Sequence, residues 1–164
     1  MDLALAPLPG LTAETAVDGS GVDALIAVAF GPGRYAKTAE RLREGNTAIA
    51  GLSFVAREGR RIVGCVRLWP VRVGGAPALF LGPFAVDPNW RSRGLGAKLI
   101  ERAVAAAQAA GHGMIILVGD GPYFEPLGFR HAPGVVLPGP VDQNRVLALP
   151  LGKTVDVPTG PLTH

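Results

Sequence analysis

Short, almost wholly apolar runs and one long segment of helical periodicity dominate the pattern of this chain. Apolar runs of strand length cover residues 52–57, 61–71, 78–86 and 114–118. Runs of this length and composition are typical of strands buried in a sheet. Between the last two runs, apolar residues recur every three or four positions from Leu95 to Ala110, which predicts a helix with one buried face.

Weaker patterns predict the remaining elements. We expect a short strand at residues 11–17, helices at 23–30 and 35–44, a helical turn at 123–127, and last strands at 135–137 and 146–149. Turn residues at 58–60 and 74–75 join the strands before the long helix into an antiparallel meander. The strand, loop, helix and strand that follow predict two parallel neighbours. The fold class is therefore α/β (α+β), with a mixed, mostly antiparallel sheet of six to seven strands and about four helices.

Length and composition favour one globular domain. The chain has 164 residues, of which 48% are hydrophobic and 18% charged, and its 23 glycines and 15 prolines imply many turns. We predict a domain over residues 1–151 and a loose tail over 152–164. A net charge of +3 suits a small anionic ligand. The chain contains no run of five basic residues, so nucleic acid is not an expected partner.

Cysteine and histidine content argue against disulfide and metal chemistry. Cys65 is the single cysteine and lies in an apolar run, so an inert core thiol is expected. The three histidines show no ligand spacing, and no metal is predicted. No apolar run reaches the roughly 18 residues of a membrane span, and the N-terminal stretch carries Asp2 where a signal peptide would carry basic residues. We predict a cytoplasmic protein with no membrane partner.

The segment between the strand at 78–86 and the long helix carries the strongest functional signal. Its glycines, Gly94 and Gly96, lie where a strand gives way to a helix and where free backbone N–H groups favour an anion. Arg91 and Arg93 strengthen the case for a phosphate, although a solvated surface role for their side chains is nearly as well supported. The dinucleotide fingerprint needs a third glycine where Leu99 stands, and the lysine of a phosphate-binding P-loop is missing.

Arg91-x-x-Gly94-x-Gly96-Ala97 resembles the pyrophosphate-binding pattern of the GNAT family of acetyl-CoA-dependent N-acetyltransferases. The resemblance runs from Leu52 to Phe129. Its context is Val86-Asp87-Pro88 before the loop and Leu127-Gly128-Phe129 after the next strand. Further short motifs are similar to those of the bacterial YhbS-like predicted acetyltransferases: Leu42-Arg43-Glu44-Gly45, Arg67-Leu68-Trp69-Pro70, Leu81-Gly82-Pro83 and Gly119-Asp120.

The resemblance implies a single GNAT-like domain in which a splayed pair of parallel strands receives acetyl-CoA. It implies the following coenzyme-binding residues: Phe84, Ala85, Val86, Arg91, Ser92, Arg93, Gly94, Leu95, Gly96, Ala97, Tyr123 and Phe124. Backbone N–H groups of the loop would hold the pyrophosphate. Backbone groups of Phe84 and Val86 would contact the pantetheine arm and polarise the acetyl carbonyl.

Proton transfer is less clearly marked in the sequence. In many family members, a tyrosine four residues before the glycine of the Gly-Phe pair acts as the general acid. That position is Phe124 in this chain, which leaves Tyr123 as the candidate general acid or a packed aromatic. The candidate bases are Asp87, Glu40, Glu44 and Asp120, each with a structural alternative as a turn or surface residue, and water is equally open. Trp69 and Trp90 are predicted to be packing residues.

Two functional hypotheses follow. The first is an N-acetyltransferase in which an amine attacks acetyl-CoA directly in a ternary complex; the second is an acyl-CoA-binding regulatory domain that has lost catalysis. A basic nucleic-acid-binding module would rest on the pI of 9.5 alone. Small-molecule and peptide amines are both open as acceptors, and the last strands permit a homodimer.

Overall fold

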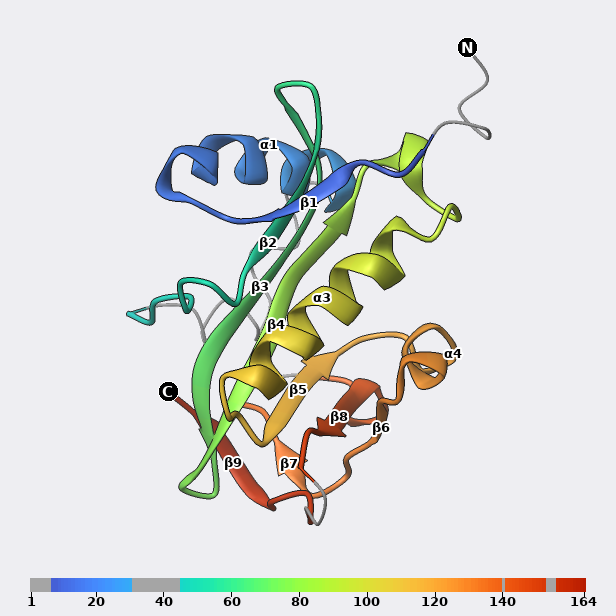
Figure 1. Cartoon of the computed structure of the whole chain (residues 1–164). Coiled ribbons are helices and arrows are strands. Elements are labelled where there is room, and N and C mark those ends of the chain that lie inside the picture. The colour runs from blue at the N-terminus through green and yellow to red at the C-terminus, as the bar shows by residue number, and fades with distance from the viewer. Residues whose placement is uncertain (1–6, 31–44, 140, 153–155) are drawn as a thin grey trace.

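The computed structural model describes residues 7–30, 45–139, 141–152 and 156–164. A long, twisted sheet has helix α1 on one face and helix α3 on the other (Figure 1). The strands are β1 Gly10–Ala13, β2 Phe54–Glu58, β3 Arg61–Val73, β4 Ala76–Val86, β5 Met114–Val118, β6 Arg130–His131, β7 Val135–Val136, β8 Val146–Pro150 and β9 Gly160–Thr163. The helices are α1 Gly19–Phe30, α3 Leu95–Ala109 and α4 Gly121–Phe124, with 3₁₀ turns η2 Ala16–Asp18, η4 Pro88–Trp90, η5 Glu125–Leu127 and η6 Gln143–Arg145.

The sheet topology confirms the predicted meander and the parallel crossover. The strand order is β1-β2-β3-β4-β5-β8-β6, and β9 joins it through β3. β4 and β5, which α3 connects, run parallel, whereas β2, β3 and β4 are antiparallel neighbours. The nine strands of the described residues exceed the six to seven expected, because the short strands β6 and β9 add to those predicted.

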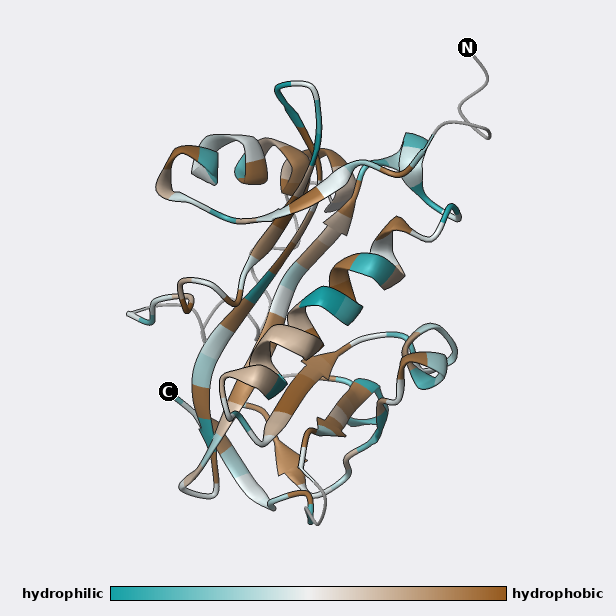
Figure 2. Ribbon diagram, viewed as in Figure 1, coloured by the Kyte–Doolittle hydropathy of each residue, from teal (hydrophilic) through white to brown (hydrophobic). Residues whose placement is uncertain are grey.

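Three apolar clusters hold the two helices and the sheet together. The largest lies between α3 and the sheet, and it extends to β5 and β8, which are almost wholly hydrophobic in Figure 2. A second lies under α1 and contains the buried thiol of Cys65, as predicted. The third covers the far halves of β3 and β4 and includes Trp69 and Leu162. Gly64 allows α3 to approach β3, since a Cβ there would lie 2.7 Å from Cδ1 of Leu99.

One irregularity in β4 affects everything that follows along that strand. Val66 lies opposite Phe84 and Leu68 opposite Leu81, so two residues of advance on β3 match three on β4. The extra residue falls at Gly82-Pro83, where Gly82 has φ 149° and the peptide bond is cis. A β-bulge of this kind leaves one residue out of the ladder and bends the strand.

The prediction of a loose tail over residues 152–164 is wrong for its last part. Gly160–Thr163 forms β9, which pairs with β3 through Arg72↔Thr163 and with β7 through Val135↔Gly160. The side chain of Leu162 is 1% exposed, so this segment is held by apolar burial as well as by backbone pairing.

Smaller differences concern the N-terminal elements. The strand expected at 11–17 ends at Ala13, because the Asp18 carboxylate accepts from the backbone N–H of Thr15 and a 3₁₀ turn follows. The helix expected at 35–44 lies outside the described residues. Within the described part of the chain, no helix combines the length and apolar composition needed to cross a membrane.

The burial of Leu162 generates a prediction about the tail. Leu162→Ala is expected to lower the free energy of unfolding by about 2 to 5 kcal/mol, because it leaves a cavity in the third cluster. Thr163→Ala, which changes an exposed neighbour in the same strand, serves as the control and should have little effect. Urea denaturation measures both. Equal stability of the two variants would show that the tail is not packed in solution.

Candidate functional site

The parallel strands β4 and β5 separate soon after they meet. Their pairing is confined to Leu79↔Ile115 and Phe80↔Ile116, although β4 continues to Val86 and β5 to Val118. We call the region between residues 81–86 of β4 and 117–118 of β5 the splay. Backbone groups on this side of β4 have lost the neighbour that would otherwise satisfy them, so they are available to another molecule.

The register of β4 decides which backbone groups face the splay. Asp87 donates its N–H to the Val63 carbonyl at 2.8 Å, while Gly64 lies opposite Val86 and Cys65 opposite Ala85. Hydrogen-bonded and non-hydrogen-bonded pairs alternate along an antiparallel ladder, so Ala85 is bonded to β3. The N–H and C=O groups of Phe84 and Val86 therefore point away from β3, toward the splay.

The bulge at Gly82-Pro83 is the cause of this arrangement. A shift of one residue exchanges the two sides of a strand. Without the extra residue, Ala85 would face the splay and Phe84 would be bonded to β3. The side chains follow the same alternation: Ala85 packs in the cluster under α1, and a Cβ at Gly96 of α3 would lie 3.0 Å from Cζ of Phe84 and 3.5 Å from Cγ2 of Val86.

The loop before α3 has a backbone suited to an anion. Ser92 and Gly94 have φ of 61° and 87°, on either side of Arg93, and Gly94 is the N-cap of α3. The first helical bond runs from the N–H of Lys98 to the carbonyl of Gly94, so the N–H groups of residues 95–97 precede the ladder. Alternating left-handed residues and an open helix start direct N–H groups to a common point, which favours a phosphate.

The two arginines of the loop contact protein groups. Arg91 donates Nε–H to the Val86 carbonyl at 3.2 Å and Nη2–H to the Ala29 carbonyl of α1 at 3.5 Å. The guanidinium of Arg93 lies over the ring of Trp90, 4.4 Å from its centroid, and Trp90 is buried as predicted. Of the backbone groups expected to serve at the splay, the Val86 carbonyl is thus already engaged. The positive charge of both side chains stays beside the loop.

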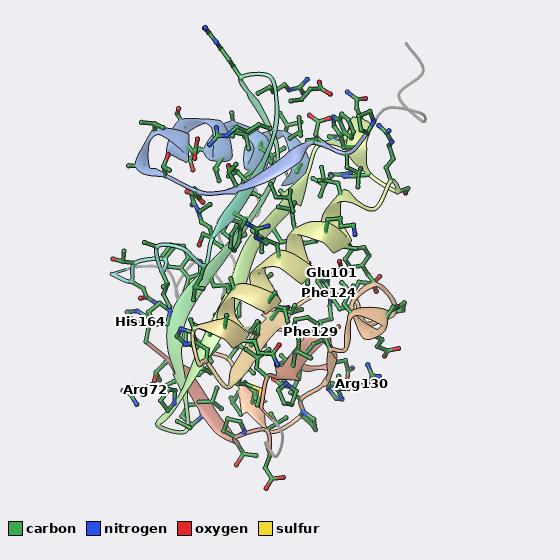
Figure 3. All side chains as sticks on the ribbon, in the orientation of Figure 1. Arg72, Glu101, Phe124, Phe129, Arg130 and His164 are labelled. Atoms are coloured by element: carbon green, nitrogen blue, oxygen red, sulfur yellow. The ribbon has the colours of Figure 1, made fainter. Side chains whose placement is uncertain are left out.

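Four aromatic rings from three segments form a wall at the start of α3. Phe84 of β4 lies 6.1 Å from Tyr123 and 6.0 Å from Phe124 between ring centroids, and Phe124 lies 5.7 Å from Phe129. Phe124 and Phe129 point into the interior (Figure 3) and are 7% and 0% exposed. Tyr123 is 42% exposed, and its hydroxyl lies so close to Gly96 that a Cβ there would clash with it. The structure therefore brings Tyr123 to the glycine loop and places Phe124 in the core.

Partial burial affects the acid–base behaviour of Tyr123. Desolvation raises the pKa of its phenol above the ordinary value of 10.0, because the ionised form is penalised more than the neutral form. The phenol is therefore protonated at neutral pH, as it would be at its ordinary pKa, and carries a proton that it can donate.

Of the candidate bases from the sequence, the structure describes Asp87 and Asp120. Asp87 is 2% exposed; its Oδ1 accepts from the N–H of Asn89 at 2.9 Å and its Oδ2 from Arg61 at 2.5 Å. This is the turn role that the sequence left open. Asp120 is exposed, and its backbone carbonyl, not its side chain, caps α4. Glu40 and Glu44 lie outside the described residues.

Sequence reasoning missed two contacts of the β3 segment opposite the bulge. Arg67 binds Glu14 through two donors, Nε to Oε1 at 2.9 Å and Nη2 to Oε2 at 2.8 Å, and the Glu14 bond raises the pKa of the guanidinium. Trp69 donates its indole N–H to the carbonyl of Gly82 at 2.5 Å. A charged residue within an apolar run, Arg67, was the signal that could have indicated the pair with Glu14. The bond from Trp69 to Gly82 depends on the register of two strands, and no sequence signal indicated it.

Metal chemistry finds no support among the residues that the structure describes. They include no group of three histidine, cysteine or acidic side chains placed to hold an ion. His131 contacts the carbonyl of Gln143 through Nε2, at 3.1 Å.

Comparison with known proteins identifies relatives of this arrangement. Residues 23–126 match the model of the acetyltransferase (GNAT) family. The uncharacterised N-acetyltransferase YhbS of Escherichia coli K12 is 31% identical over 121 residues, which cover 73% of this chain and 72% of that protein. The structure of Escherichia coli YhbS in complex with CoA has a TM-score of 0.83 at 24% identity and covers 97% of this chain and 91% of that one. A GNAT acetyltransferase from Brucella melitensis in complex with acetyl-CoA has a TM-score of 0.74 at 26% identity, with 94% of each chain covered.

The raised pKa of Tyr123 predicts a measurable titration. In the folded protein the phenol should ionise above 10.0, whereas in the unfolded chain it ionises near that value. The folded state therefore favours the protonated form. Its contribution to stability is complete below about pH 10 and is lost as pH rises through the folded pKa. Ultraviolet difference absorbance between the wild type and Tyr123→Phe isolates this group from the other tyrosine of the chain. Ionisation at or below the ordinary value would contradict the burial seen here.

Proposed function

Because the chain belongs to the GNAT family of acetyltransferases, we propose that it transfers an acetyl group from acetyl-CoA to an amine by direct attack in a ternary complex. The observation that carries this proposal is the register of β4. It turns the backbone of Phe84 and Val86 toward the splay, directly beside the helix start that suits a phosphate.

The proposed donor site has two parts. The N–H groups of residues 92–97, opened by Ser92 and Gly94, would hold the pyrophosphate of the coenzyme, while that of Arg91 is donated to the Pro88 carbonyl. The pantetheine arm would lie along the splay and add to β4 as a strand-like neighbour, using the N–H and C=O of Phe84 and the N–H of Val86. The acetyl-CoA complex of the Brucella melitensis relative supports acetyl-CoA as the donor.

The proposed chemistry needs no covalent enzyme intermediate. The lone pair of a neutral amine attacks the thioester carbon, and the carbonyl oxygen gains negative charge that the Phe84 N–H stabilises. The C–S bond then breaks, and the sulfur takes the phenolic proton of Tyr123, which the solvent later restores. The amine proton passes to water, since the Asp87 carboxylate is already held by Arg61 and by the N–H of Asn89.

The remaining predictions about partners and location stay part of this proposal. The acceptor is a small-molecule amine or a peptide amine. Nucleic acid and membranes are not partners, and the protein acts in the cytoplasm. The chain acts as a monomer or as a homodimer formed through its last strands.

One observation favours the second candidate function, acyl-CoA binding without catalysis. The Tyr123 hydroxyl lies against the glycine of the helix start, and Phe124 occupies the position where many family members carry the tyrosine acid. Acetyl-CoA binding with no CoA release across a panel of small amines, lysine peptides and peptide N-termini would support this alternative over transfer.

Filling Gly96 tests the donor site. Gly96→Leu is expected to weaken acetyl-CoA binding at least about 100-fold, since its side chain would fill the space between Phe84, Val86 and the loop. Gly113→Leu is the matched control, because no atom lies within 4 Å of a Cβ at that exposed position. Isothermal titration calorimetry measures affinity, and circular dichroism checks the fold. Wild-type affinity in a folded Gly96→Leu protein would refute the proposed site.

Removal of the Tyr123 hydroxyl tests the proposed acid. Tyr123→Phe should lower kcat by about 100-fold or more, the usual contribution of a general acid, while leaving acetyl-CoA affinity nearly unchanged. CoA release with the best amine from the panel gives the rate. A loss of affinity with unchanged kcat would instead assign Tyr123 to coenzyme binding.

A further inference from the structure

Trp69 is the side chain that holds the bulge of β4. It lies on β3 opposite Phe80, and its indole crosses diagonally to the carbonyl of Gly82 at 2.5 Å. The residue is 9% exposed and packs in the third apolar cluster. An indole N–H can only donate, so a buried indole needs an acceptor at a fixed place. Here that acceptor is a backbone carbonyl of the bulge.

The Gly82 carbonyl, which Trp69 binds, lies where β4 has lost its regular partners on both sides. Gly82 follows Phe80 and Leu81, where β4 loses β5, and it lies where the β3–β4 register shifts. Bulged residues are left out of the ladder. At this point β4 has neither a regular partner on the β3 side nor a strand on the β5 side. The hydrogen bond from Trp69 ties the bulge back to β3.

The position of the bulge decides the direction of the Phe84 N–H, two residues further along β4. If the extra residue moved beyond Phe84, this N–H would bond to β3 and leave the splay. A buried, directional bond at Gly82 opposes such a slip. Apolar packing of the indole ring alone would not select one carbonyl, because hydrophobic contact has no direction.

We propose that Trp69 is a positioning residue for acetyl transfer: its indole N–H fixes the Gly82 carbonyl and thereby aims the Phe84 N–H at the acetyl carbonyl. This inference rests on the proposed function, because it concerns the same donor site. It adds a role to a side chain that the sequence marked only for packing.

The test uses acetyl-CoA labelled with ¹³C at the acetyl carbonyl, so no acceptor is needed. Hydrogen bonding polarises the carbonyl, and its ¹³C resonance in the wild-type complex should move downfield from that of free acetyl-CoA. Trp69→Phe removes the N–H. The resonance should then move most of the way back to that of free acetyl-CoA, while the affinity for acetyl-CoA stays unchanged. With the best amine of the panel, kcat should fall about tenfold, less than the loss of an oxyanion donor itself, while KM for acetyl-CoA stays the same.

Two further variants separate positioning from packing. Benzothienylalanine at position 69 keeps the bicyclic ring and replaces the N–H by sulfur, so it should reproduce the Trp69→Phe result even where the smaller ring destabilises the fold. Val73→Ala, at the far end of β3 in the same apolar cluster, matches the loss of packing and should leave the carbonyl resonance unchanged.

The outcomes distinguish this inference from the proposed function. If the wild type binds acetyl-CoA and shows the downfield shift, and both Trp69 variants keep it, Trp69 serves packing only and the inference is overturned. A shift lost equally in Val73→Ala would overturn it as well, since loss of packing would then suffice. If the wild type does not bind acetyl-CoA, the proposed function fails first and the inference falls with it.

Discussion

The one extra residue in β4 is the constraint on which the rest of the site depends. Because a strand has two sides and a period of two, the bulge at Gly82-Pro83 exchanges the roles of all residues from Phe84 to Val86. The same shift sends the side chains of Phe84 and Val86 under the first turn of α3 and their backbone groups into the splay. Side-chain packing and backbone recognition are thus consequences of a single register.

Several contacts then bind this strand end to its surroundings. The aromatic wall joins β4 to α4 through Phe84 and Tyr123, and Arg91 links the end of β4 to the loop and to α1. Asp87, ion-paired with Arg61, closes the turn that leads into the loop. Each contact is modest alone, since a single hydrogen bond contributes about 1 kcal/mol. Together they fix three backbone segments, from β4, the loop and α4, around one point.

The sequence predicted the helices and strands more accurately than the contacts between them. The strands from residue 54 to 86, the helix at 95–109 and the glycine loop were predicted, because buried strands and an amphipathic helix leave periodic signals. The bulge was not, since it belongs to a pair of strands and not to either alone. The Glu14–Arg67 pair joins residues 53 positions apart, and β9 gains its place from partners in β3 and β7. Arg91 and Arg93 were placed at the right loop, but their side-chain partners could not be inferred from local sequence.

The alternation along the end of β4 also separates two kinds of selective pressure. Ala85 contributes to the cluster beneath α1, together with Cys65 and Val55, and its backbone is committed to β3. Its immediate neighbours face the opposite side of the sheet and the helix start. Substitution of Ala85 therefore affects mainly the packing of α1. Substitution of Phe84 or Val86 affects mainly the loop before α3 and the splay. Within three consecutive codons, drift on one face can proceed while the other face is held constant.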